Sequence, residues 1–210
     1  APDFIRPIGH LGTDLADSEH VMYSRGTLID AAKEAEFVQM AVAPVFDRSY
    51  EHFCSHLHSP SSRKECYPAI VETSQTAYFI HPIFTQYQVN TPGWYKKLFR
   101  NELNRLLEKP IVQHNGPSSV VTNLLEQSEY NRQILHILHY VPQRKCSLMD
   151  IVDDIIPLYN LKIVMQVRKK VKAVYTAPKI GNIEFTVEDG TLTFSIPEIK
   201  GHQMCIIDLQ

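Results

Sequence analysis

A β-hairpin is the element that residues 183–196 of this sequence encode most clearly. Apolar side chains alternate with polar ones in two runs: Ile183, Phe185, Val187 and Leu192, Phe194, Ile196. Asp189-Gly190 lies between the runs, and Asp-Gly favours a tight hairpin because both central positions need a positive φ. We therefore expect an antiparallel sheet in this part of the chain.

Short strands recur over the last ninety or so residues. We expect seven of them, at 120–126, 132–140, 161–167, 173–176, 183–187, 192–196 and 202–209. Seven short strands at regular spacing predict an antiparallel β-sandwich of immunoglobulin-like type. Acidic and apolar residues are mixed in the segment 150–159, and we expect an irregular loop or a short helix there.

The earlier part of the chain mixes strands and a helix. Phe37 to Val45 is apolar-rich and is expected as a buried strand or as a strand plus a turn. Two apolar runs, 69–71 and 77–80, flank the polar turn 72–76. The helix begins with Thr91 as N-cap and Pro92 at the first helical position, and Pro110 ends it. Its apolar face is expected to hold Tyr95, Leu98, Phe99, Leu103, Leu106 and Leu107, and its polar face Lys96, Lys97, Arg100 and Glu102.

The two parts meet in a stretch rich in turn-forming residues, 113–119. We therefore expect an α+β protein with domains at 1–112 and 113–210. The first twenty residues are typical of the middle of a protein sequence rather than of its start, so we expect a piece of a longer chain.

Composition excludes several classes of function. The net charge is -2, and the basic run Arg168-Lys169-Lys170 is expected as a solvated loop, so no nucleic-acid partner is predicted. No apolar stretch is long enough to span a membrane, and eight glycines leave little room for a phosphate-binding loop, so no cofactor is predicted. Cysteines at 54, 66, 146 and 205 form no Cys-x-x-Cys pair, and Cys205 is expected as a buried free thiol, which favours a reducing, cytoplasmic location.

A cluster of metal-ligand types lies at His52, Cys54, His56 and His58. In a strand all four side chains point to one side, whereas in a helix His52 and His56 lie one turn apart on one face. Imidazole and thiolate are zinc ligands, although the spacing matches no known finger or metalloprotease pattern. The alternative is a loop of hydrogen-bonding residues.

No catalytic residue is predicted. A Gly-x-Ser-x-Gly elbow is absent, and the acids Glu72, Asp150, Asp153 and Asp154 cannot be paired in space from sequence. Trp94, the only tryptophan, is the one candidate for stacking on a sugar, although packing against neighbouring strands or another subunit is favoured.

Two segments carry a resemblance to a known family. Residues 77–84 (Ala-Tyr-Phe-Ile-His-Pro-Ile-Phe) resemble the last core strand, and residues 94–103 (Trp-Tyr-Lys-Lys-Leu-Phe-Arg-Asn-Glu-Leu) the final helix, of the trimerisation domain of family 42 β-galactosidases. That domain has the flavodoxin-like fold of class I glutamine amidotransferases without their catalysis.

The resemblance implies a partial flavodoxin-like segment followed by a C-terminal β-sandwich, with an upstream catalytic barrel as partner and assembly into a homo-oligomer. The catalytic acids would lie in the barrel, so the expected function is that of a non-catalytic accessory and oligomerisation region of a glycoside hydrolase. The alternatives are a carbohydrate-binding module and a small metal-dependent hydrolase built on residues 52–58.

Overall fold

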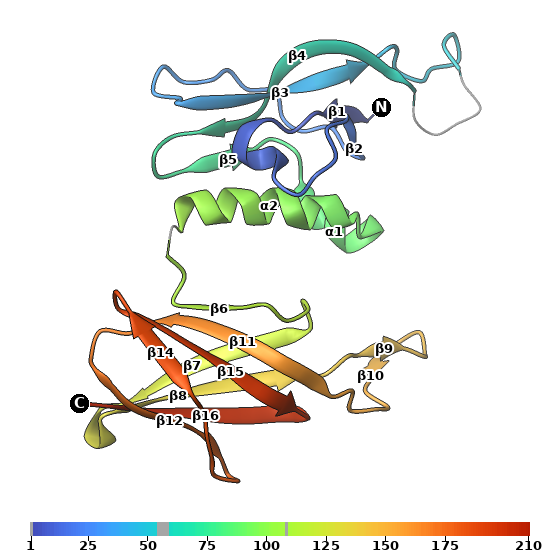
Figure 1. The fold of residues 1–210 in the computed structure, drawn as a ribbon. Coiled ribbons are helices and arrows are strands. Elements are labelled where there is room, and N and C mark those ends of the chain that lie inside the picture. The colour runs from blue at the N-terminus through green and yellow to red at the C-terminus, as the bar shows by residue number, and fades with distance from the viewer. Residues whose placement is uncertain (1, 54–58, 108) are drawn as a thin grey trace. The chain divides into compact units, whose positions relative to one another are not determined.

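The computed structural model describes residues 2–53, 59–107 and 109–210. The chain forms two compact units, Ala1–Glu108 and Lys109–Gln210 (Figure 1). The division predicted from the sequence, 112/113, lies a few residues further along.

The first unit is built on a five-stranded sheet in the order β2-β1-β3-β4-β5. Its strands are β1 (Asp3–Ile5), β2 (His20–Met22), β3 (Phe37–Pro44), β4 (Ser61–Glu72) and β5 (Ala77–Phe79). The expected strand at residue 37 and the strand–turn–strand around 72–76 are confirmed. A 3-10 helix, η1 (Gly9–Gly12), follows β1.

Two helices, α1 (Ile83–Asn90) and α2 (Gly93–Leu106), lie along one face of this sheet (Figure 1). The predicted helix is α2, but Pro92 rather than Thr91 is its N-cap. Thr91 instead ends α1 in a left-handed conformation with φ 49°. The sequence did not predict α1, because its apolar residues form no clear stripe and Ile83 alone is buried among them.

The flavodoxin-like prediction for this unit is corrected by the strand directions. Every strand pair that the structure describes in the sheet is antiparallel. A flavodoxin-like sheet needs parallel strands joined by helical crossovers. Of the segment 77–84, expected as a strand, only Ala77–Phe79 is a strand, and Ile83 and Phe84 begin α1. The segment 94–103 does form a helix, but it lies on an antiparallel sheet.

The second unit is an antiparallel β-sandwich, as predicted. One sheet has the order β14-β15-β11-β6 and the other β13-β12-β16-β8-β7. The strands of the first are β6 (Val112–His114), β11 (Leu158–Gln166), β14 (Phe185–Glu188) and β15 (Thr191–Ile199). Those of the second are β7 (Val120–Gln127), β8 (Arg132–His139), β12 (Val171–Ala177), β13 (Gly181–Asn182) and β16 (Gly201–Leu209).

Shorter elements complete this unit. The 3-10 helix η2 (Ser128–Tyr130) connects β7 to β8. A separate pair, β9 (Gln143–Arg144) and β10 (Asp150–Ile151), forms a small hairpin. The expected irregular segment 150–159 is therefore part strand, because its first residues pair in this hairpin and its last belong to β11.

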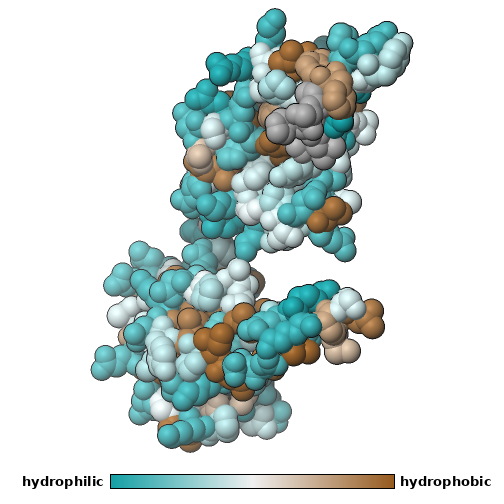
Figure 2. Space-filling model, turned by 90° about the vertical axis from the view of Figure 1, so that its right-hand side faces the viewer, coloured by the Kyte–Doolittle hydropathy of each residue, from teal (hydrophilic) through white to brown (hydrophobic). Residues whose placement is uncertain are grey.

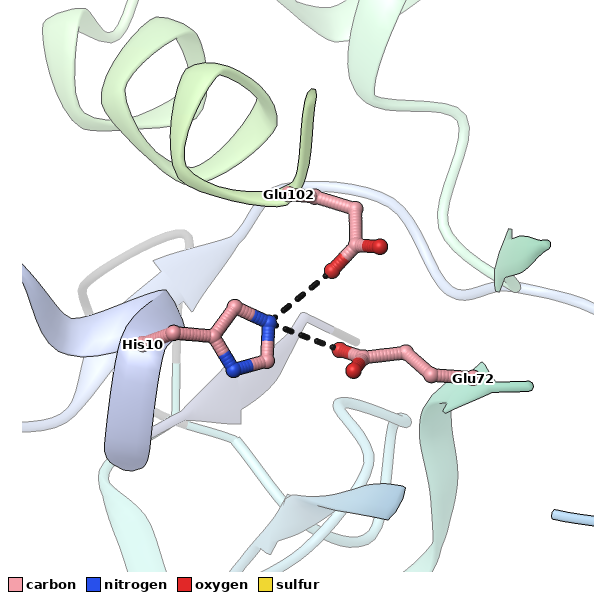
Figure 3. Close-up of side chains that lie close together, drawn as sticks. All are labelled: His10, Glu72 and Glu102. Atoms are coloured by element: carbon pink, nitrogen blue, oxygen red, sulfur yellow. Dashed lines mark hydrogen bonds and ion pairs between the residues drawn. The ribbon is translucent and has the colours of Figure 1, made fainter. Parts of the chain in front are cut away.

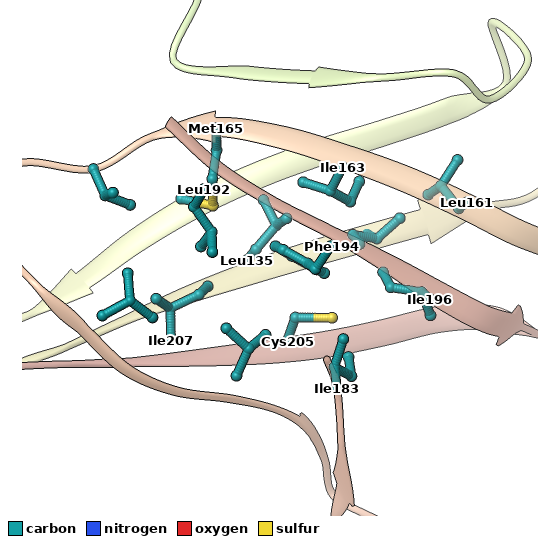
Figure 4. Close-up of a cluster of buried hydrophobic side chains, with 14 of the residues drawn as sticks. Leu135, Leu161, Ile163, Met165, Ile183, Leu192, Phe194, Ile196, Cys205 and Ile207 are labelled. Carbon is teal, nitrogen blue, oxygen red and sulfur yellow. The ribbon is translucent and has the colours of Figure 1, made fainter. Parts of the chain in front are cut away.

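Side chains from both sheets meet in the sandwich core (Figure 4). The predicted hairpin pairs β14 with β15, with Asp189 and Gly190 both at positive φ. Leu192, Phe194 and Ile196 are at most 2% exposed and point into the core. Cys205 is buried and free, as expected, and burial raises the pKa of its thiol to about 12.

No helix among the described residues is long and apolar enough to cross a membrane. On the face shown in Figure 2, hydrophobic residues of each unit gather in small groups between hydrophilic ones.

Candidate functional site

Three side chains from distant parts of the first unit meet at one point (Figure 3). His10 comes from η1, Glu72 from the last position of β4 and Glu102 from the second half of α2. Nε2 of His10 lies 3.0 Å from Oε2 of Glu102 and 3.2 Å from Oε1 of Glu72. Among the described residues, this is the group of three whose ligand atoms could hold a metal ion, since these atoms all lie within 4.8 Å of one another.

Arg105 holds the opposite side of the two carboxylates. Its Nη2 lies 2.7 Å from Oε1 of Glu102, and its Nε lies 3.3 Å from Oε2 of Glu72. The guanidinium also donates to the carbonyl oxygens of Thr73 and Thr76. Arg105 is therefore fixed by the turn that follows β4, and both acids are fixed through it.

The partners of the two buried acids set their protonation apart. Glu72 and Glu102 are each 2% exposed. Burial raises the pKa of Glu72, and the hydrogen bond to Glu102 and the charge of Glu102 raise it further, to about 7. Burial also acts to raise the pKa of Glu102, but hydrogen bonds from Arg105 and His10 outweigh it and lower that pKa. Below about pH 7, one proton is therefore bound to the pair, and it resides on Glu72.

The sequence did not reveal this site. Glu102 was expected on the polar face of its helix, and Glu72 was assigned to a turn, but both are buried. On α2 the buried positions are Tyr95, Leu98, Asn101 and Glu102, so the buried face includes two polar residues. Periodicity predicts that charged residues are exposed because it does not reveal distant partners. Here Arg105 lies 33 residues from Glu72, and His10 lies 92 residues from Glu102.

A second buried pair, Asp3 and His81, lies in the same unit. Oδ2 of Asp3 lies 2.9 Å from Nε2 of His81, and Arg25 donates to Oδ1. Burial acts to raise the pKa of Asp3, but hydrogen bonds from His81, Tyr67 and Arg25 outweigh it and lower that pKa. The pair joins β1 to the segment after β5, and its geometry supports a structural role.

The histidine and cysteine cluster predicted from the sequence is only partly visible. His52 is exposed, its backbone N–H bonds Oγ of Ser49, and its ring lies 6.0 Å from that of Phe46. Cys54, His56 and His58 lie outside the described residues. The metal site at 52–58 therefore stays a prediction.

Trp94 is half-buried at the start of α2. Its ring centroid lies 4.9 Å from that of His20 and 4.5 Å from that of Tyr95. These contacts seat the indole against the body of the unit, and its role in sugar binding stays a prediction.

Two of the other acids weighed for glycoside hydrolysis, Asp150 and Asp153, lie in exposed ion pairs. Asp150 pairs with Arg144, and Asp153 pairs with Lys145. Glu72 and Glu102 are close enough for a hydrogen bond between them, whereas a hydrolase needs its two carboxylates about 5 Å or more apart across a sugar. The carboxyl groups of Glu72 and Glu102 are therefore too close together to lie across a glycosidic bond.

Comparison with solved structures supplies the strongest link to a known protein. The whole chain superposes with a TM-score of 0.92 and 31% sequence identity on α-L-fucosidase isoenzyme 2 from Paenibacillus thiaminolyticus. The match covers 100% of this chain and 32% of that one, so the chain spans about a third of the enzyme's length. No protein-family model matches the sequence, and neither does any curated protein at the significance required.

The chain is thus similar to part of a glycoside hydrolase, as the sequence led us to expect. The match is to an α-L-fucosidase, and no comparison supports the specific resemblance to family 42 β-galactosidases.

Proposed function

We propose that this chain is an accessory region of a glycoside hydrolase and carries no reaction chemistry of its own. The observation that carries the proposal is the match over its entire length to about a third of an α-L-fucosidase. A likeness that spans both units at 31% identity supports a common origin for the whole region. The parent activity that this match favours is hydrolysis of α-L-fucosides rather than of β-galactosides.

The chemistry of the described residues agrees with an accessory role. The acids that lie close together are almost fully buried and held by Arg105, with no room for a sugar ring between them. The catalytic carboxylates then belong to a barrel elsewhere in the parent protein, which is this region's proposed partner. We also propose that the region supports assembly of the parent into a homo-oligomer.

A carbohydrate-binding module is less well supported. Binding to a sandwich face needs a row of exposed aromatic rings, whereas the exposed tyrosines of the described sandwich lie on separate elements: Tyr130 in η2, Tyr140 after β8 and Tyr159 in β11. Tyr130 is moreover covered by the guanidinium of Arg132, 4.8 Å from the ring centroid.

The experiment that tests the proposal compares a longer protein carrying this region with a version from which it is deleted. We expect the longer protein to hydrolyse an aryl α-L-fucoside far faster than an aryl β-D-galactoside. Deletion should reduce both activity and the molar mass of the assembly measured by light scattering. A longer protein that prefers the galactoside would contradict the proposed parent activity, and a deletion without effect would contradict the supporting role.

A further inference from the structure

When Glu72 and Glu102 are both ionised, the cluster that they form with His10 carries one more negative charge than Arg105 compensates. Two carboxylates, each 2% exposed, face one permanently charged cation, Arg105. Buried charges are normally paired or bound to metal ions, because isolated ones are costly to remove from water. A bound cation in place of the proton on Glu72 would balance that charge.

One ligand atom in the cluster is unpartnered. Oε1 of Glu72 is buried and has no hydrogen-bond partner among the described residues. It lies 3.2 Å from Nε2 of His10, but that nitrogen is in hydrogen-bonding geometry with Glu102. A ring nitrogen carries at most one proton, so Oε1 of Glu72 points into the site without a donor.

The spacing of the ligand atoms fits a small divalent ion. Zinc binds imidazole nitrogen and carboxylate oxygen at about 2.0–2.2 Å, which places neighbouring ligands of a tetrahedral ion about 3.3 Å apart. Nε2 of His10 lies 3.0 and 3.2 Å from the two inner carboxylate oxygens. The ligand atoms of the three residues all lie within 4.8 Å of one another, so an approach of the two carboxylates would enclose an ion.

The surroundings also resemble those of a metal site. Metal-ligating carboxylates are typically held by a second layer of hydrogen bonds. Arg105 contacts the outer oxygens, Oε1 of Glu102 and Oε2 of Glu72, and leaves the inner ones facing His10. The imidazole side chain is 33% exposed, which provides a path for an ion to enter.

We propose that His10, Glu72 and Glu102 bind one divalent transition-metal ion, of which zinc fits the ligand set best. One imidazole and two carboxylates suit zinc better than calcium or magnesium, which prefer oxygen ligands alone. The ion joins η1, the end of β4 and α2, and so acts as a structural clamp of the first unit. This proposal is independent of the hydrolase proposal, and either can fail without the other.

Zinc titration of the metal-stripped full chain tests the proposal. We expect calorimetry to show one zinc ion per chain, and cobalt in its place to give the visible absorption bands of a low-symmetry site. His10→Asn and Glu72→Gln should each weaken zinc binding at least 10-fold. His202→Asn is the matched control, because His202 lies 3.0 Å from His136 in an exposed pair on the sandwich and is unrelated to the cluster. His52→Asn is the second control, because it alters the predicted 52–58 site.

Each outcome decides the matter. Zinc that is lost in the His10 and Glu72 variants and kept in both controls supports the clamp. A wild-type chain that takes up less than about a tenth of an equivalent overturns it, since a site of three protein ligands holds zinc tightly. Zinc that is lost only in His52→Asn or His202→Asn also overturns it. If Glu72→Gln does not fold by circular dichroism, His10→Asn, at a half-buried position, carries the comparison.

Discussion

The carboxylates of Glu72 and Glu102 lie on the same side of one imidazole nitrogen, 3.2 and 3.0 Å from Nε2 of His10. Thirty residues separate the two acids in the sequence, and β4 and α2 bring them together in the interior of the first unit. Arg105 closes the other side of the pair. The stability of the first unit should therefore depend on the charge balance at this point.

Removing Arg105 should strongly destabilise the protein. Arg105→Ala leaves two buried carboxylates with no permanent cation, and breaking a buried pair in this way costs about 3 kcal/mol. The free energy of unfolding from urea titration measures the loss. Arg100→Ala is the matched control on the same helix, because Arg100 forms an exposed pair with Asp14 and such pairs contribute about 0–1 kcal/mol. Equal losses in the two variants would contradict this account of the cluster.

The metal-free protein should lose stability as the pH rises from about 4.5 to about 7. Glu72 has its pKa raised from 4.5 to about 7 in the folded state. Over that range the native chain keeps a proton that the unfolded chain has released, so raising the pH favours unfolding. Urea titrations at several pH values in the presence of a chelator measure the slope.

Glu72→Gln should remove this contribution, because glutamine has no proton to lose. The exposed Glu34→Gln serves as the control and should keep the wild-type slope. An identical pH dependence in wild type and Glu72→Gln would show that Glu72 ionises normally.

Asp3 should have the opposite effect at low pH. Its pKa is lowered from 3.8 in the folded state, so its contribution is present above about pH 4 and is lost as the pH falls through the folded value. Asp3→Asn should lower the free energy of unfolding at pH 7 and make that free energy less dependent on pH in the acid range. Asp17→Asn, in an exposed pair with Arg6, is the control and should change stability at neutral pH by less than about 1 kcal/mol. Acid unfolding followed by circular dichroism distinguishes the two.

The stability of the sandwich should depend on the side chains that pack between its two sheets. Leu192 is fully buried between the sheets, and Leu192→Ala should cost about 2–5 kcal/mol in the free energy of unfolding. Leu125→Ala, on β7 with the side chain 46% exposed, should cost much less. Thermal unfolding of the two variants side by side gives the comparison, and similar losses would argue against the core as described.

Elements whose signal lies within a few neighbouring residues could be predicted from the sequence. The hairpin at Asp189-Gly190 and the strands of the sandwich follow from alternation and turn chemistry. The helix at 93–106 follows from its spacing of apolar residues, although its start was placed one residue early. The direction of the strands in the first sheet could not be predicted. Segments such as β1 and β3 are far apart in the sequence, and a local pattern of residues does not show that they pair.

The candidate site could not be predicted for the same reason. Glu102 lies among charged residues on a helix, where a solvated position is the ordinary expectation. Its burial follows from His10, 92 residues away, and from Arg105 one turn along. The pair Glu102 and Arg105 at i, i+3 was the only local signal, and such pairs are common on exposed helices.

Hydrolysis by the isolated 210-residue chain tests the central claim most directly. We predict no release of aryl alcohol from an aryl α-L-fucoside or an aryl β-D-galactoside above the rate of buffer alone, with or without zinc. A longer protein carrying the region should hydrolyse the fucoside under the same conditions. Turnover by the isolated chain that is lost in Glu72→Gln or Glu102→Gln would contradict the account, because it would place the catalytic acids in this region.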